Sequence, residues 1–273
     1  MAEPSDRELA TDAAVADAAR ANALDRYLAA RLAPRAARRD LIALAAFVGD
    51  TARIAATASE PLIGEIRLQW WRDVLGPGPA EGEATGNPVA DALRQAIARH
   101  ALPAEPFAKL LEARSRALDP EFGMSGAALD QHLDETEGAA FRLAARILGV
   151  PPGEAADKLL FAAGQSYGRV QLLRAVPLML EARQRSPRAH LVNDWAELAP
   201  AILDGARSSL QQVRRNSRAA PESANAAILP TALVEPYLTA LERLGPAIVR
   251  ERADISPLTR VWRLWRASVR GTI

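Results

Sequence analysis

The side chains that most often perform chemistry in proteins are few and scattered in this sequence. The absence of cysteine excludes disulfides, thiolate metal sites and a cysteine nucleophile. The histidines, His100, His132 and His190, lie far apart, and only His132 has acids beside it, Asp134 and Glu135. We expect the histidines at the surface and these acids at the start of a helix, where they stabilise the helix dipole. The sequence therefore predicts no metal site, and no catalytic triad, phosphate loop or nucleotide fingerprint has its required context.

The C-terminal segment, residues 256–273, combines four arginines and two tryptophans with no acid. Arranged as a helix, it has two separate stripes. The apolar stripe contains Leu258, Val261, Trp262, Trp265 and Val269, and the cationic stripe contains Arg260, Arg263, Arg266 and Arg270. An interfacial membrane helix needs such a separation. A last helix that packs its tryptophans on the core and leaves its arginines in water would show the same pattern, so both interpretations stay open.

Helical periodicity accounts for most of the chain. Apolar residues recur at steps of three and four, and no alternating run of Val, Ile and Thr is bounded by turns. We expect helices at 8–32, 38–57, 62–75, 89–100, 105–118, 125–148, 153–185, 194–216, 230–244 and 256–270. The sequence thus predicts an all-α fold of nine or ten helices. Its 273 residues and 49% hydrophobic content fit a single domain over residues 1–273.

Composition and charge set limits on partners and location. The formal net charge of +1 gives no overall field that would attract nucleic acid. No uncharged stretch of about 18 apolar residues is present, so we expect no segment that spans a bilayer. The first twenty residues are acidic and lack the pattern of a signal peptide. We therefore expect a cytoplasmic protein, with any contact to the inner membrane being peripheral.

Four stretches of the sequence carry a family resemblance. They are RRDLIALAAFVGDTARI at 38–54, EPLIGEIRLQWWRDVLG at 60–76, LDETEGAAFRLAARILG at 133–149 and AGQSYGRVQLLRAVP at 163–177. Together they resemble the squalene/phytoene synthase family, over a region from about Tyr27 to His190. The resemblance implies the isoprenoid synthase fold, a single-domain helical bundle around a central cavity.

The same resemblance shows which residues are missing. Enzymes of this family hold a prenyl diphosphate through magnesium ions, which bind D-x-x-x-D patterns on two facing helices. The positions of the first pattern are occupied by Ala52 and Ala56, and those of the second by Leu178 and Ala182. None of these side chains can bind a metal, so the resemblance implies no cofactor. Magnesium would be required only under the alternative, an active prenyl transferase with an aberrant site.

Asp50, Arg53, Glu65 and the motif QWWRD at 69–73 resemble a non-catalytic branch of the same superfamily. That branch includes a mitochondrial assembly factor for respiratory complex I and its alphaproteobacterial relatives. The resemblance implies an assembly or lipid-handling factor near a membrane, with a respiratory-complex client protein as a partner.

The resemblance also places Arg53 and Arg174 on the two helices that face each other across the cavity. Their guanidinium groups could bind the phosphate of an anionic or polyprenyl lipid without a metal. They could instead fill a closed site with ion pairs, Arg53 with Asp50 and Arg174 with Glu65. The sequence leaves both interpretations open.

Further candidates for the cavity wall are Tyr27, Trp70, Tyr167 and Gln171. Aromatic side chains with one polar end suit a lipid tail, although such residues are more often part of a core. Tyr167 and Gln171 are the strongest of these candidates, because both accompany Gly168 on the expected cavity helix.

Overall fold

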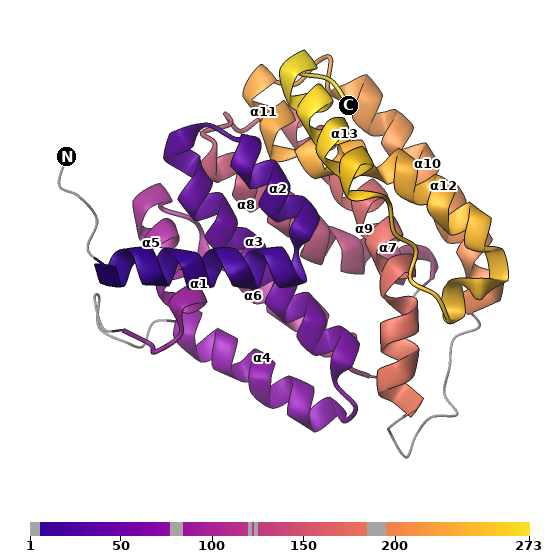
Figure 1. Cartoon of the computed structure of the whole chain (residues 1–273), viewed down its shortest axis with the longest axis horizontal. Helices are drawn as coiled ribbons and strands as arrows, with labels where there is room; N and C mark the ends of the chain where they lie inside the picture. The colour runs from indigo at the N-terminus through magenta and orange to yellow at the C-terminus, as the bar shows by residue number, and fades with distance from the viewer. Residues whose placement is uncertain (1–5, 77–83, 120–121, 123–124, 185–194) are drawn as a thin grey trace.

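The computed structural model describes residues 6–76, 84–119, 122, 125–184 and 195–273, and every regular element among them is helical (Figure 1). The predicted all-α fold is confirmed. The α-helices are α1 (Asp6–Asn22), α2 (Leu24–Leu32), α3 (Arg35–Thr57), α4 (Pro61–Leu75), α5 (Pro88–His100), α6 (Ala104–Arg116), α7 (Gly126–Leu133), α8 (Ala139–Ile147), α9 (Glu154–Gln184), α10 (Trp195–Asn216), α11 (Glu222–Ala227), α12 (Val234–Leu244) and α13 (Pro257–Arg270). A π-helical turn, η1 (Asp134–Gly138), joins α7 to α8, and the 3₁₀ turns η2 (Leu229–Leu233) and η3 (Gly245–Val249) flank α12.

Apart from shifts of a few residues at helix ends, the structure differs from the predicted helices at three places. The predicted helix 8–32 is two helices, because the backbone of Ala23 leaves the helical region at φ −146° and ψ 49°. The predicted helix 125–148 is present, but it contains the π-helical turn η1. The short helix α11 was missed, since six residues are too few to show a helical period.

The longest helix, α9, is the scaffold against which α3, α8, α10, α12 and η1 pack. Two glycines allow the closest of these approaches. A Cβ atom on Gly164 would lie 2.6 Å from the Cα of Gly138, and one on Gly168 would lie 2.8 Å from a methyl group of Leu133. The α7–η1–α8 segment therefore meets α9 almost backbone to backbone, which brings their polar residues within reach of one another.

Burial of α3 on most of its surface agrees with its Ala-rich, largely apolar sequence. Phe47 on this helix makes edge-to-face contacts with Trp71 at 5.0 Å and with Phe107 at 5.7 Å between ring centroids. These rings belong to a hydrophobic core that continues from α2 to α13. Removing this apolar surface from water is the main stabilising contribution to the fold.

The two helices with the largest exposed apolar surfaces lie on different sides of the molecule (Figure 1). The last helix, α13, packs against α2 and η2, whereas α4 packs against α6. Among the described residues, no helix is both long enough and apolar enough to cross a bilayer.

Candidate functional site

A carboxylate on α2, Asp25, is the centre of a buried polar network, with only 5% of the residue exposed. It accepts hydrogen bonds from the Tyr237 hydroxyl and from Nε of Arg260, each at 2.9 Å. The Tyr167 hydroxyl and the Gln171 amide donate to its Oδ2 atom at 3.3 Å and 3.2 Å. Side chains from α2, α9, α12 and α13 therefore meet at a single carboxylate.

Two buried arginines complete this arrangement. Arg174 lies 3.7 Å from Asp25 and 3.3 Å from Asp254, and Arg260 also pairs with Asp254, at 2.5 Å. The Arg174 guanidinium group stacks on the Tyr237 ring, 3.9 Å from its centroid. Two carboxylates thus pair with two guanidinium groups, which meets the requirement that buried charges be compensated. We call this set the Asp25 network: Asp25, Tyr167, Gln171, Arg174, Tyr237, Asp254 and Arg260.

The network keeps its two tyrosines protonated. Burial raises the pKa of Tyr167 and of Tyr237, and the nearby charge of Asp25 raises both further. Partial burial opposes ionisation of Asp254, but a backbone hydrogen bond and the two arginine charges outweigh it and lower the pKa of that carboxyl. The tyrosines therefore act as hydrogen-bond donors, and neither can serve as a base at neutral pH.

A second buried cluster adjoins the Asp25 network and has Glu137 of η1 at its centre. Arg26 and Arg114 donate to the Glu137 carboxylate at 2.7 Å and 3.1 Å. Arg26 also lies over the rings of Phe141 and Tyr167, at 4.4 Å and 5.3 Å from their centroids. Burial disfavours the charged carboxylate, but the two arginines overcome this cost and lower the pKa of Glu137. The bundle interior near α2 and α9 thus contains charges that are paired with one another.

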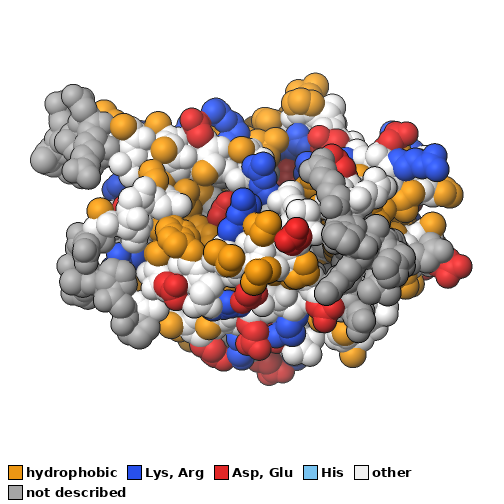
Figure 2. Space-filling view, turned by 90° about the horizontal axis from the view of Figure 1, so that it is seen from below, with side chains coloured by type: hydrophobic (Ala, Val, Ile, Leu, Met, Phe, Trp, Pro, Cys, Tyr) orange, Lys and Arg blue, Asp and Glu red, His pale blue; other side chains and the backbone are white. Residues whose placement is uncertain are grey.

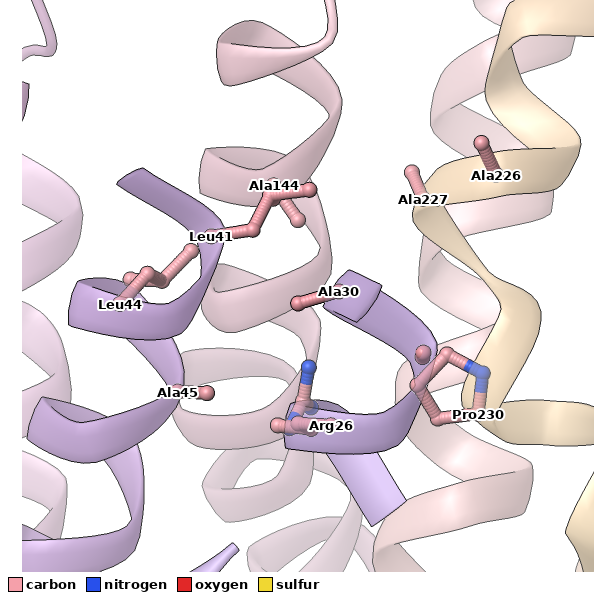
Figure 3. Close-up of a pocket in the computed structure, with 10 residues that line it drawn as sticks. Arg26, Ala30, Leu41, Leu44, Ala45, Ala144, Ala226, Ala227 and Pro230 are labelled. Atoms are coloured by element: carbon pink, nitrogen blue, oxygen red, sulfur yellow. The ribbon is translucent and has the colours of Figure 1, made fainter. Parts of the chain in front are cut away.

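A small cavity between α2, α3, α8 and α11 borders the second cluster (Figure 3). Its volume is about 30 Å³, and its lining consists of Arg26 with alanine, leucine and proline side chains. Such a space holds a water molecule or two, whereas ligand pockets usually measure roughly 300–1,000 Å³. This cavity cannot accommodate a prenyl chain.

Three of the predicted site residues, Tyr167, Gln171 and Arg174, come together in the Asp25 network. Arg174 forms buried ion pairs, as one of the two interpretations expected, but its partners are not the predicted one. Glu65 instead accepts hydrogen bonds from Arg72 and Ser115. The acids that Arg174 meets are Asp25 on α2 and Asp254, and both lie far away in the sequence.

The other predicted site residues lie away from the network. Asp50 accepts a hydrogen bond from the Trp71 indole at 2.9 Å, so the predicted ion pair between Asp50 and Arg53 is wrong. The exposed Arg53 side chain instead donates to the Asn22 amide oxygen, at 3.3 Å. Because Arg53 is exposed and Arg174 is buried with carboxylate partners of its own, the two arginines do not form a shared anion site in this structure.

Two of the predicted aromatic residues are also outside the network. Trp70 is partly exposed on α4 and packs edge-on against Trp71, with 5.1 Å between ring centroids. Tyr27 is half-buried and packs against a small apolar cluster formed by α1, α3 and α5. Neither lines the 30 Å³ cavity.

The surface location predicted for the histidines is wrong for His132. This residue is only 4% exposed, packs near Phe122, and has its pKa lowered to about 3 by burial and by the charge of Arg114. His100 is half-buried, with Nε2 2.7 Å from the carboxylate of Asp40. His190 lies outside the described residues.

The predicted helix-start position of Asp134 and Glu135 is also wrong. The helix begins earlier, at Gly126, so both acids lie within its π-helical turn. Asp134 pairs with Arg142 at 2.7 Å, and Glu135 pairs with Arg116. Their role is to hold neighbouring segments together.

Sequence reasoning missed Asp25, Tyr237 and Asp254, and it assigned Arg260 to the outer cationic stripe. A signal for two of them is nevertheless present. Asp25 shares a helix face with the buried Ala29, four residues later, and Arg260 shares one with Leu264 and Ala267. A charged residue on a buried helix face was therefore the available clue.

The residues at the family's metal-binding positions do not fit magnesium. Ala52 and Ala56 on α3 and Leu178 and Ala182 on α9 have no side-chain oxygen to offer. Within the described ranges, no group of three or more histidines and acids is placed to hold a metal ion.

Comparison with known proteins agrees with the geometry. The family model for squalene/phytoene synthases matches residues 19–259. The chain belongs to the squalene/phytoene synthase family. Its relatives include the mouse and human proteins named "NADH dehydrogenase (ubiquinone) complex I, assembly factor 6", each 25% identical, over 260 and 264 residues. In both cases the match covers 88% of this chain and 78% of the relative.

Solved structures of the squalene/phytoene synthase family share this fold. A dehydrosqualene synthase crystallised with a ligand superposes with a TM-score of 0.66 at 14% identity, covering 96% of each chain. The squalene synthase HpnC from Alicyclobacillus acidocaldarius gives a TM-score of 0.58 at 19% identity, covering 86% of this chain and 94% of its own. The predicted isoprenoid synthase fold is thus confirmed.

Proposed function

We propose that this protein is a non-catalytic member of the squalene/phytoene synthase family that serves as an assembly factor for respiratory complex I. One observation carries the proposal: the positions that should bind magnesium are apolar, and one turn before Leu178 on α9, Arg174 is already engaged in the buried Asp25 network. The relatives named for complex I assembly support this client.

The electrostatics argue against prenyl transfer. A departing pyrophosphate develops negative charge, and an active site without metal ligands or free cations forfeits several kcal/mol of stabilisation, on the order of a metal's contribution. Arg174 and Arg260 cannot replace the metal, because a diphosphate that recruited them would leave the carboxylate of Asp25 buried and unpaired. The alternative, a prenyl transferase that uses magnesium at an aberrant site, gains no support from these residues.

The same geometry bears on lipid binding in the interior. Arg53 is exposed on α3, whereas Arg174 is buried and already paired. We infer that Arg174 supports the fold, that Arg53 is a surface residue, and that any lipid meets the protein at its outer surface. Native mass spectrometry of the purified protein tests this inference, since a retained polyprenyl phosphate would contradict it.

Respiratory complex I is a membrane complex, so the proposed role has a defined location. The protein would act as a peripheral protein on the cytoplasmic side of the inner membrane, beside its client. Nucleic acid is not a partner in this proposal, because a formal net charge of +1 provides no general attraction for it.

The proposal can be tested by complementation. Cells that lack complex I assembly factor 6 would receive this chain with a mitochondrial targeting segment, and assembled complex I would be measured on native gels. We expect partial or full restoration. In parallel, the purified protein should give no condensation product from farnesyl diphosphate and magnesium, with a dehydrosqualene synthase as the positive control. Magnesium-dependent turnover above background would overturn the non-catalytic assignment.

A further inference from the structure

Helix α13 directs an unusual set of side chains outward. Only Arg260, Leu264 and Ala267 of this helix are buried, and these face α2 and η2. The opposite face is the predicted apolar stripe, with Trp262 53% and Trp265 47% exposed and their rings 5.1 Å apart. The interpretation that packs these tryptophans on the core is therefore wrong, since the stripe Leu258, Val261, Trp262, Trp265 and Val269 lies in solvent.

A basic groove runs along one flank of this stripe. It has a volume of about 260 Å³ and lies between α13, α10, α12 and η2. Its charged lining consists of four arginines, Arg214, Arg263, Arg266 and Arg270, and one acid, Glu235. Glu235 pairs with Arg214 and Arg263, at 3.3 Å and 3.1 Å, so among the described residues Arg266 and Arg270 have no carboxylate partner.

We propose that α13 is the membrane-contacting surface of this protein, lying in the headgroup region of an anionic bilayer. The apolar stripe would enter the acyl region, and Arg266 and Arg270 would meet lipid phosphates at the mouth of the groove. This inference rests on the proposed function, a role beside a membrane, and names the surface that meets that membrane. Amphipathic helices with tryptophan on one face and arginine on the flank bind interfaces in this orientation.

Charge complementarity favours a membrane over a protein partner at this surface. Residues 256–273 contain no acid, and the neighbouring groove carries an excess of positive charge. Tryptophan suits the headgroup boundary, where one end of the ring is apolar and its N–H is hydrated. An anionic lipid bilayer can therefore bury the apolar stripe in its acyl region and pair its phosphates with the arginines of the basic groove.

Two other surfaces of the molecule expose apolar side chains but differ from α13 in their charge. A groove of about 360 Å³ between α10 and α12 is mainly apolar, but its Arg207 is paired with Asp204 and Glu242. On α4, Leu62 and Ile66 are exposed, and Figure 2 shows the lower face of the molecule with hydrophobic side chains among charges of both signs. In both places acids outnumber arginines: the groove has Asp204 and Glu242 beside Arg207, and residues 60–76 contain three acids and two arginines. Neither surface therefore has the excess of positive charge that would select an anionic bilayer.

The test is co-sedimentation of the full chain with vesicles of phosphatidylcholine containing about one third phosphatidylglycerol. We expect binding at low ionic strength, little binding to phosphatidylcholine alone, and release by salt. The Debye length falls from about 30 Å at 0.01 M to about 3 Å at 1 M, which screens the arginines. Absence of binding to anionic vesicles at low salt would overturn the proposal.

Matched variants locate the surface. Arg266→Gln with Arg270→Gln should weaken vesicle binding about 25-fold, roughly fivefold for each arginine. Arg67→Gln with Arg20→Gln removes the same charge from α4 and α1 and should change binding little. Likewise, Trp265→Ser should weaken binding about tenfold, whereas Trp70→Ser on α4 should not. Equal effects of the paired variants would contradict the assignment to α13.

Two further measurements distinguish loss of membrane binding from unfolding of a variant and from self-association of the protein. Circular dichroism should show every variant folded, because the substituted side chains are all at least partly exposed. Analytical ultracentrifugation should show a monomer, and a dimer that Trp265→Ser dissociates would identify the stripe as a self-association surface and overturn the proposal. Vesicle binding uses purified protein, so it can fail while complementation of complex I assembly succeeds.

Discussion

The inner and outer faces of α13 use the same residue type in opposite surroundings. On the inner face, Arg260 is 5% exposed and bonded to Asp25, Asp254 and the Tyr237 hydroxyl. On the outer side, Arg266 and Arg270 line a groove at the protein surface. An interior guanidinium group is stable only with its carboxylates in place, whereas an outer one is stable in water and free to meet a new anion. One face therefore serves the fold, and the other is available for recognition.

The contrast also bears on the family's metal-binding positions, which in this chain have no side-chain oxygen. The resemblance places a metal-bound diphosphate between α3 and α9, but here the bundle interior contains an anion of its own, the carboxylate of Asp25. Two arginines and two tyrosines surround this carboxylate. The chain thus supplies both signs of charge internally, and its buried arginines Arg174 and Arg260 are neutralised by its own carboxylates.

The largest effect on the inner face is expected from Asp25→Asn. This change leaves Arg174 and Arg260 with Asp254 as their remaining partner, and breaking a buried pair costs about 3–5 kcal/mol of unfolding free energy. Urea denaturation followed by circular dichroism measures this loss. Asp17→Asn is the matched control, because Asp17 also pairs with an arginine, at 2.6 Å, but in solvent.

For Asp17→Asn we expect a change of about 0–1 kcal/mol. Similar losses for the two aspartate variants would show that the interior network contributes no more than a surface pair. The distinction between the inner and outer charges would then fail.

A smaller effect, with a direct bearing on the predicted site, is expected from Arg174→Gln. This change leaves part of the Asp25 network unpaired, but Arg260 still compensates Asp25, so we expect a loss near the lower end of about 3–5 kcal/mol. Arg53→Gln should cost less than about 0.5 kcal/mol, as for other surface substitutions. Equal losses would contradict the different roles that the structure gives these arginines.

Much of the fold could be predicted from the sequence because helical periodicity is a local property. The positions of α3, α4, α9 and α13 follow from apolar residues at steps of three and four, and from prolines at helix starts. The break at Ala23 and the π-helical turn at Asp134–Gly138 could not be predicted, because tertiary contacts select them over the local preference for helix.

The candidate site was predicted only in part, for a related reason. Tyr167, Gln171 and Arg174 lie at steps of three and four along one helix, so their common direction is visible in the sequence. Their partners Asp25 and Arg260 are separated by 235 positions, and only the packing of α13 against α2 brings them together. Periodicity shows on which face of its helix a residue lies, but it does not show which residue of another helix lies opposite.

The smallest expected effect concerns pH and again distinguishes the interior from the surface. Burial and the charge of Arg114 lower the pKa of His132 from 6.5 to about 3. Between these values the unfolded chain binds a proton that the folded protein does not. The stability that depends on His132 being neutral is therefore complete above pH 6.5 and is lost as the pH falls toward 3. The slope of unfolding free energy against pH should approach about 1.4 kcal/mol per pH unit.

His132→Gln removes the titrating group, so the unfolding free energy of this variant should vary less between pH 6.5 and 5, where most carboxyl groups remain ionised. Urea denaturation at a series of pH values measures both slopes, and the comparison does not depend on the absolute stability of the variant. Parallel slopes for the two proteins would show that His132 is protonated inside the fold, which is incompatible with its burial beside Arg114.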